Sequence, residues 1–139
     1  MTKLETYLFF DGDCAEAMKF YEQVLSGKLS VVPVKGSPAE PHVPPGSEDK
    51  LLHARLDVDG AVIMASDWLD TTPFPGQSGF SVTLTVADAA AAKALFDKLL
   101  EGGKATMPFG KTFWSEGFGQ VVDKFGTPWM VMAESNPQS

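Results

Sequence analysis

The chain has 139 residues, 44% hydrophobic and 21% charged, which is the composition of one globular domain with a sizeable core. Its formal net charge of −7 and its scattered basic residues argue against nucleic-acid binding, because phosphate recognition requires clustered Lys and Arg. No apolar run reaches the roughly 18 residues of a membrane helix, no signal peptide is recognisable, and the single cysteine fits a reducing compartment, so we expect a cytoplasmic protein without membrane contact.

The first half opens with an expected strand over residues 6–10, followed by a helix. Asp13 is the predicted N-cap, and Glu16, three residues later, completes a capping-box pattern. Ser26-Gly27 is expected to end the helix. The apolar positions fall on one helical face, made of Ala17, Phe20, Tyr21, Val24 and Leu25.

Further along, Pro33 makes the strand over residues 29–34 an edge strand, because proline cannot donate to a ladder. Residues 35–50 are rich in Pro, Gly, Ser and acidic residues and are expected to form a mobile loop. The next two strands, residues 51–58 and 61–66, are predicted to pair through an Asp59-Gly60 turn.

The second half is expected to repeat this order after a linker over residues 68–79. Asp88 is the predicted N-cap of a helix over residues 89–101, which Gly102-Gly103 ends. The other predicted strands cover residues 81–86, 104–107, 120–123 and 128–133, the last two joined at Phe125-Gly126.

The two halves match in sequence pattern. Residues 6–25 superpose on residues 81–100 without a gap at an offset of 75, and residues 59–66 superpose on 125–132 at an offset of 66. We therefore predict an α+β fold of two tandem βαβββ modules, residues 4–67 and 80–134, in a single domain over 1–139. The nine-residue difference between the offsets falls in the loop of the first half.

Alternation along the strands assigns their faces. Val82, Leu84 and Val86 are apolar and are expected to pack under a helix, while the residues between them are polar. In the strand over residues 51–58 the polar set contains His53 and Arg55. These polar sets would line the concave side of the sheet and form the wall of a pocket; a solvated sheet face is the alternative.

The sequence resembles a known family in several short segments that occur in order. They are YLFFDGDCAEAMKFY, LLHARLDVDG, IMASD, GGKATMPFGKTFW and DKFGTPWMVM. Together they are similar to the PhnB-like branch of the vicinal-oxygen-chelate superfamily, which includes glyoxalase I, bleomycin-resistance proteins and extradiol dioxygenases. The methyltransferase name attached to this branch finds no support in the sequence, since no Gly-rich loop suited to a nucleotide cofactor follows a strand.

This resemblance implies that the eight strands form a U-shaped, partly closed barrel, commonly in a homodimer. It also implies metal ligands on the first and last strand of each module, positions that fall here at Thr6, Ser81, Met64 and Met130. Hydroxyls and thioethers are poor ligands for the Ni, Zn, Fe or Mn of these enzymes. We therefore predict no metal and no cofactor. A shift of one residue would bring Glu5 to the first position only.

His53 is the foremost candidate for ligand contact or for general-base chemistry, with a hydrogen-bonded structural histidine as the equal alternative. Asp67 could pair with His53 or anchor a turn, and the structural role is favoured. His42 lies in the loop and is taken as incidental. Cys14 lies at a helix start among carboxylates that would raise its thiol pKa, so it is interpreted as structural.

Aromatic residues gather in the second module, where Trp114 is a candidate for the pocket and Trp129, by face parity, for the core or an interface. The leading hypothesis is a metal-free protein that binds a small organic molecule in the barrel. The predicted ligand-binding residues are Thr6, His53, Arg55, Met64, Asp67, Ser81, Trp114 and Met130, with Phe10 as a further apolar contact.

Two alternatives stay open. One is an isomerase, lyase or dioxygenase that uses a non-standard metal site, made of His53, Asp67 and either His42 or Glu5, or metal-free acid–base chemistry by His53. The other is an interaction module whose barrel is filled.

Overall fold

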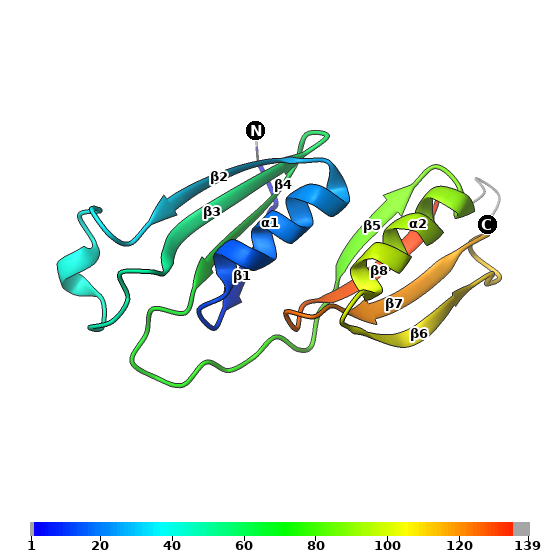
Figure 1. Cartoon of the computed structure of the whole chain (residues 1–139). Coiled ribbons are helices and arrows are strands. Elements are labelled where there is room, and N and C mark those ends of the chain that lie inside the picture. Colours follow the sequence, from blue (N-terminus) through cyan, green and yellow to red (C-terminus); the bar gives the residue numbers. More distant parts are fainter. Residues whose placement is uncertain (1, 135–139) are drawn as a thin grey trace. The chain divides into compact units, whose positions relative to one another are not determined.

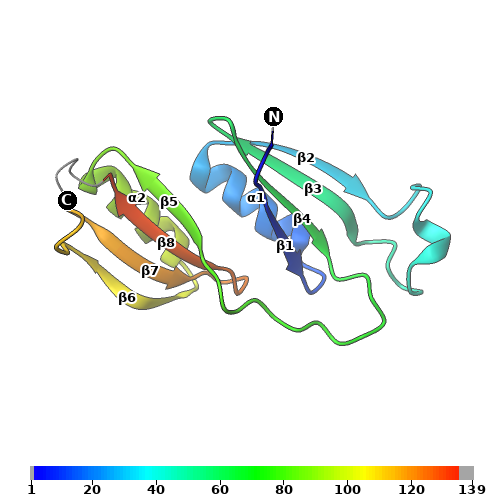
Figure 2. The same ribbon diagram turned by 180° about the vertical axis from the view of Figure 1, so that it is seen from behind.

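The computed structural model describes residues 2–134, and the chain divides into two compact units, Met1–Gly76 and Gln77–Ser139. Unit 1 contains, in chain order, β1 (Thr6–Phe10), α1 (Cys14–Leu25), β2 (Lys28–Pro33), the 3-10 helix η1 (Glu40–His42), β3 (Leu51–Val58) and β4 (Ala61–Asp67). Unit 2 contains β5 (Val82–Val86), α2 (Ala89–Leu100), β6 (Lys104–Gly110), β7 (Phe118–Val122) and β8 (Pro128–Ala133). Figures 1 and 2 show these elements from opposite sides.

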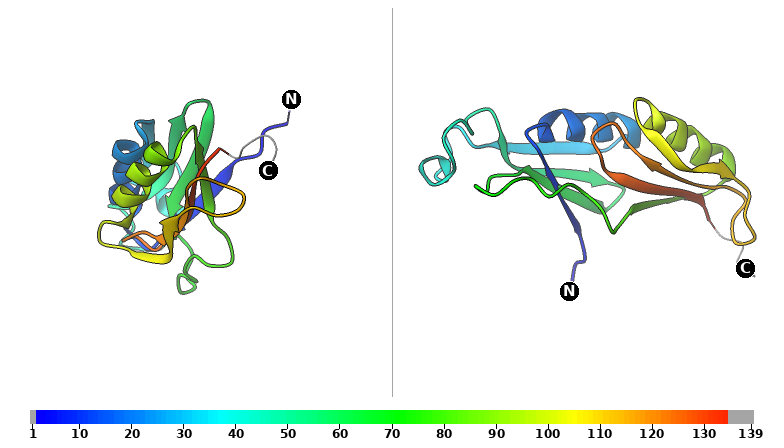
Figure 3. Two further views of the ribbon diagram at one scale, coloured as in Figure 1. Left: turned by 90° about the vertical axis from the view of Figure 1, so that its right-hand side faces the viewer. Right: turned by 90° about the horizontal axis from the view of Figure 1, so that it is seen from below.

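Each unit is one four-stranded mixed sheet with one helix on a single face (Figure 3). The strand order is β1-β4-β3-β2 in unit 1 and β5-β8-β7-β6 in unit 2, and in both sheets only the first and last strands of the unit pair in parallel. The predicted α+β fold with two tandem βαβββ modules is therefore confirmed. The single domain and the closure of the two sheets into a barrel stay predictions.

The core of unit 1 lies between α1 and the sheet. Every third or fourth residue of α1 is buried, starting at Cys14, and the sheet contributes side chains that are at most 2% exposed, among them Leu8, Phe10, Ala54 and Leu56. The predicted apolar face of α1 is partly wrong, because Met18 is buried while Phe20 and Leu25 are only half-buried.

At the C-terminus of α1 and in the β3–β4 hairpin, the backbone requires residues that tolerate a positive φ or the absence of a side chain. Ser26 adopts the left-handed conformation with φ of 53°, and its neighbour Gly27 lies so close to β3 that a Cβ would stand 2.7 Å from the carbonyl oxygen of Asp57. In the hairpin, Asp59 and Gly60 both have positive φ, 49° and 87°, as the predicted two-residue turn requires.

Unit 2 buries a smaller helical face, formed by Ala92, Phe96 and Leu99, against its own sheet. The predicted N-cap is confirmed, since the Asp88 side chain accepts a hydrogen bond from the Ala91 N–H at 2.8 Å. Trp129 is fully buried, and its indole N–H donates to the carboxylate of Asp123 at 2.7 Å. The core location predicted for Trp129 is confirmed.

The strand register corrects the gapless superposition of the two halves. Thr6 pairs with Ile63, and Val82 pairs with Trp129, so the first strands of the units correspond at an offset of 76 while the helices correspond at 75. The turn that joins strand to helix is one residue shorter in unit 2. A one-residue shift exchanges the two faces of a strand, so it changes which side chains are equivalent.

The structure also shows where several of the predicted strands begin and end. β2 lies at the sheet edge, as predicted, but spans Lys28–Pro33 and not the predicted residues 29–34. β6 is longer than the predicted strand over residues 104–107. Within residues 2–134, neither helix is long and apolar enough to cross a membrane.

Candidate functional site

Unit 1 presents one sheet face that α1 does not cover, called here the helix-free face. Side chains alternate along each strand, so Tyr7 and Phe9 of β1 point away from the buried Leu8 and Phe10. Met64 lies in register between Tyr7 and Arg55, and His53 lies opposite Val32. The positions that the sequence predicted for His53 and Arg55 on this face are therefore confirmed, and Asp57 and Met64 lie there as well.

His53 is hydrogen-bonded to Tyr7. The Tyr7 hydroxyl lies 3.1 Å from His53 Nδ1, and the two ring centroids are 5.7 Å apart. Tyr7 stands on β1 and His53 on β3, so the tyrosine reaches across β4 to meet the imidazole. This contact fixes the ring orientation and leaves Nε2 as the nitrogen available to a ligand.

A row of aromatic rings continues from Tyr7 along this part of unit 1. We call Tyr7, Phe9, Trp68 and Phe74 the aromatic strip. Consecutive ring centroids are separated by 5.1 Å, 5.6 Å and 6.0 Å, and the last two contacts are edge-to-face. The Trp68 indole donates to the Thr72 carbonyl at 2.8 Å, which holds the start of the linker against the strip.

Large aromatic side chains on this strip are incompletely buried. Tyr7 is 39% exposed and Phe9 is 42% exposed, while Trp68 and Phe74 are half-buried. Neighbouring exposed aromatics that form one surface often mark a binding site.

Arg55 is engaged by its neighbour on the same strand. Its Nε and Nη2 donate to the two carboxylate oxygens of Asp57, each at 3.2 Å. The Asp57 hydrogen bond is the main reason that the Arg55 pKa is raised, and the same contact lowers the Asp57 pKa. Because both side chains are 43% exposed, water screens this pair and a ligand could compete for either partner.

Asp67 does not reach His53. It ends β4 in register with Phe10 on the helix-covered face, is 2% exposed, and accepts two backbone hydrogen bonds, from Cys14 N–H at 2.9 Å and from Leu51 N–H at 2.8 Å. The carboxylate thus connects the start of α1 to the start of β3. An acid–base pair of Asp67 with His53 is not formed in the structure.

The predicted capping box is wrong, because Asp13 lacks the extended backbone of an N-cap, with φ of −112° and ψ of 24°, and its side chain makes no capping hydrogen bond. The N–H of Cys14, the first residue of α1, donates to Asp67. Burial is the largest cause of the raised Asp13 pKa. Burial also raises the pKa of the Cys14 thiol to about 12, with Asp67 and Asp13 adding to the rise. A thiol that is fully buried and has so high a pKa stays protonated and unreactive, so the role of Cys14 is structural.

Thr6 and Ser81, the predicted first-strand positions, are not equivalent. Thr6 faces the α1 side of the sheet of unit 1, in register with Ile63, whereas Ser81 precedes β5 and alternates with the exposed Thr83 and Thr85. The residues that pair with Met64 and Met130 are Tyr7 and Thr83. Phe10 is 1% exposed in the core, so it contributes no surface.

Unit 2 carries a different helix-free face. Met130 lies in register between Thr83 and Gln120, and Gln120 lies beside Met107, with its amide nitrogen 3.9 Å from the sulfur. Trp114, half-buried, packs edge-to-face on Phe118 at 5.3 Å. The neighbouring Phe113 is 93% exposed.

The remaining candidates are scattered. His42 is exposed in η1, and no group of three or more His, Cys, Asp or Glu side chains in the described part of the chain is arranged to hold a metal ion. The sequence interpretation missed Tyr7, Phe9 and Trp68. The sequence did contain a sign of them, because Tyr7 and Phe9 of the segment TYLFF alternate with Leu8 and so lie on the opposite face of the strand. In a strand made almost entirely of apolar residues, however, hydrophobicity alone does not show which face is buried.

Comparison with known proteins gives consistent matches over almost the whole chain. A family sequence model described as 3-demethylubiquinone-9 3-methyltransferase matches residues 2–132. Protein YjdN of Escherichia coli (strain K12) is 33% identical over 137 residues, which are 92% of either chain.

Solved structures also match this chain over almost its whole length. Protein PA1353 from Pseudomonas aeruginosa has 41% sequence identity and a TM-score of 0.90, covering 98% of this chain and 100% of that chain. The PhnB protein from Bacillus cereus has 27% identity and a TM-score of 0.79, covering 95% and 99%. A glyoxylase/bleomycin resistance protein/dioxygenase domain from Frankia sp. EAN1pec, at 13% identity and a TM-score of 0.68 over 99% and 95%, shares the fold.

Proposed function

The chain belongs to the family described as 3-demethylubiquinone-9 3-methyltransferase, the PhnB-like branch of the vicinal-oxygen-chelate superfamily, and we propose that it binds a small organic molecule on the helix-free face of unit 1. The observation that carries the proposal is the aromatic strip, whose members Tyr7 and Phe9 are exposed beside the hydrogen-bonded His53. A sheet face that only had to be solvated would carry polar residues in these places.

The side chains of the helix-free face indicate which kind of ligand would bind there. The strip offers ring surfaces for a flat apolar group, and His53 Nε2 stands at one end to hydrogen-bond a polar substituent. Asp57 already neutralises Arg55, and the whole chain carries a net charge of −7, so neutral or weakly polar molecules are favoured over strong anions.

The test is a fluorescence titration of the whole chain with the neutral flat probe N-phenyl-1-naphthylamine. We expect saturable binding, and a roughly tenfold loss of affinity in Phe9→Ala, the size of one well-packed aromatic contact. Val31→Ala is the control, because Val31 is 46% exposed but stands in register with Ala54 on the opposite face. Equal affinities of the two variants would contradict the proposal.

A second candidate is acid–base catalysis by His53, as in an isomerase or lyase. It is favoured by the 3.1 Å contact with the Tyr7 hydroxyl, which can accept from Nδ1–H and so leave Nε2 unprotonated as a base. Imidazole nitrogen NMR distinguishes the tautomers. A proton on Nε2 in the unliganded protein would contradict this role.

The non-standard metal site belongs to the same candidate. Elemental analysis of purified protein and thermal unfolding with added Ni, Zn, Mn or Fe test it directly. A stoichiometric metal, or a rise in melting temperature that His53→Ala abolishes, would support a metal-dependent enzyme; unchanged melting would contradict it.

We propose in addition that the protein is a cytoplasmic homodimer. The support is the family resemblance for the dimer and the single cysteine, Cys14, for a reducing compartment. Light scattering coupled to size-exclusion chromatography tests the dimer: a monomer mass at micromolar concentration would contradict it.

A further inference from the structure

The loop between β2 and β3 is folded against its own backbone. The Val34 N–H donates to the Lys50 carbonyl at 3.0 Å, which closes the loop at its base, and the Lys50 N–H donates to the Ser47 carbonyl at 3.0 Å. The Ser47 hydroxyl donates to the Pro44 carbonyl at 2.7 Å. Val34 is fully buried and Ser47 is 3% exposed, so the loop has a small interior of its own.

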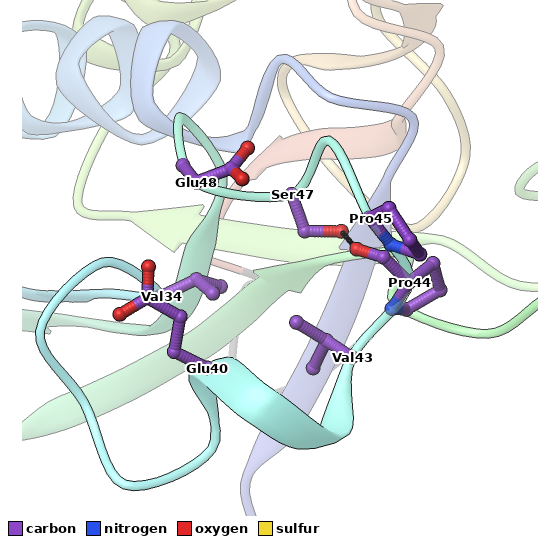
Figure 4. A pocket seen from close by; sticks show the side chains of 7 residues that line it. All are labelled: Val34, Glu40, Val43, Pro44, Pro45, Ser47 and Glu48. Carbon is purple, nitrogen blue, oxygen red and sulfur yellow. Dashed lines mark hydrogen bonds between the residues drawn. The ribbon is translucent and has the colours of Figure 1, made fainter.

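This interior opens into a hollow of about 210 Å³. An apolar cavity of roughly 150 Å³ holds a benzene ring, so the space suits a molecule of about that size. Figure 4 shows Pro44 and Pro45 on one side of the lining residues and Val34 and Glu40 on the opposite side, with Glu48 next to Ser47. The residues that line it are Val34, Glu40, Val43, Pro44, Pro45, Ser47 and Glu48.

The lining combines hydrocarbon walls with negative charge. Two valines and two prolines supply apolar contact, and no Lys, Arg or His is among the lining residues. Glu40 uses one carboxylate oxygen to accept the Gly36 N–H at 3.0 Å, which fixes the side chain and leaves the other oxygen available. Within residues 2–134, neither Glu40 nor Glu48 forms an ion pair.

We propose that this hollow binds a small organic cation: a protonated amine with a ring or short hydrocarbon body. The apolar body would lie against the valines and prolines while the ammonium group meets the carboxylates of Glu40 and Glu48. A bare divalent metal fits less well, because calcium requires six to eight oxygen ligands and the walls are mainly hydrocarbon. The site shares no residue with the helix-free face and does not rest on its proposed function.

The experiment is a backbone amide NMR titration of the whole chain with benzylamine, benzyl alcohol and benzoate near pH 7. The three probes have the same ring and differ in charge. We expect saturable shift changes from benzylamine in residues 34–50, with millimolar affinity, and at least fivefold weaker binding of the other two. Equal binding of benzyl alcohol, or shift changes confined to other residues, would overturn the proposal.

Matched variants test whether the carboxylates of Glu40 and Glu48 are required for benzylamine binding. Glu48→Gln and Glu40→Gln should each weaken benzylamine binding roughly two- to fivefold, the range of one partly exposed ion pair. Glutamine at position 40 can still accept the Gly36 N–H, so the loop keeps its fold. Asp49→Asn is the control, because Asp49 is an exposed acid of the same loop outside the lining. A loss of affinity in Asp49→Asn equal to that in Glu48→Gln would overturn the proposal.

Discussion

The two units have the same topology but hold the starts of their helices in different ways. In unit 2 the cap is local, since Asp88 accepts a hydrogen bond from an N–H three residues along the chain. In unit 1 the cap comes from Asp67, 53 positions after the Cys14 N–H that it accepts, and the same carboxylate also binds β3. Unit 2 has Ala133 at the corresponding register position, in line with Val86. A local cap stabilises a helix, whereas a distant cap also ties the helix to the sheet.

The helix-free faces differ as well. Unit 1 exposes Tyr7 and Phe9 at the register positions where unit 2 exposes Thr83 and Thr85. Beside them, Ser66 of unit 1 corresponds to Met132 of unit 2. Aromatic rings are rigid and present flat surfaces, while methionine adapts its shape. The shared scaffold therefore determines where side chains stand, and each unit uses those positions differently.

Removing the two caps should give the largest contrast. We expect Asp67→Ala to lower the free energy of unfolding by roughly 3–5 kcal/mol, because two buried N–H groups lose a charged acceptor. Asp88→Ala should cost about 1 kcal/mol, the usual loss for an exposed cap. Urea unfolding measures both values.

Hydrogen exchange assigns each loss to its unit. Asp67→Ala should speed exchange across α1 and β3, and Asp88→Ala only in the first turn of α2. Equal losses of stability, or faster exchange spread over both units by either variant, would show that the distant cap has no special structural role.

The pH dependence contributed by Cys14 is the next effect in size. Its pKa is about 12 in the folded protein and 9.0 without burial, so the folded state holds the proton more tightly. The stabilisation is complete below pH 9 and is lost as pH rises toward 12, with a slope of up to about 1.4 kcal/mol per pH unit. Urea unfolding between pH 8 and 11 should therefore show a steeper decline in the native protein than in Cys14→Ala. Identical slopes would contradict the assignment.

Tyr7→Phe should have the smallest effect on stability, within about 0.5 kcal/mol, because the hydrogen bond to His53 is exposed. The same change should alter the nitrogen chemical shifts of His53, since Nδ1 loses its partner. Thr83→Val, at the corresponding position of unit 2, is the control and should leave the His53 signals unchanged. Unaltered His53 signals in Tyr7→Phe would mean that the hydroxyl does not orient the ring.

Several features were predictable because their causes lie within a few residues. The Asp88 cap, the Asp59-Gly60 turn and the polar alternation at His53 and Arg55 are all local patterns, and all are confirmed. The Asp13 capping box failed although its pattern was present, because Asp13 has φ of −112° and ψ of 24°, not the extended backbone that Asp88 has as a cap. The Cys14 N–H donates to Asp67, and a partner so far away in sequence leaves no local trace.

By itself, then, the sequence determined the duplicated βαβββ topology and the family. Both follow from the periodicity of apolar residues and from short segments that occur in order, and these can be recognised without knowing any contact. Only the tertiary structure decided that Tyr7, not Thr6, shares a face with His53, and that Asp67 serves the backbone of α1 and β3. The physical reason is that strand parity depends on a register set by the neighbouring strand, and a buried carboxylate goes to whichever N–H groups packing brings within reach.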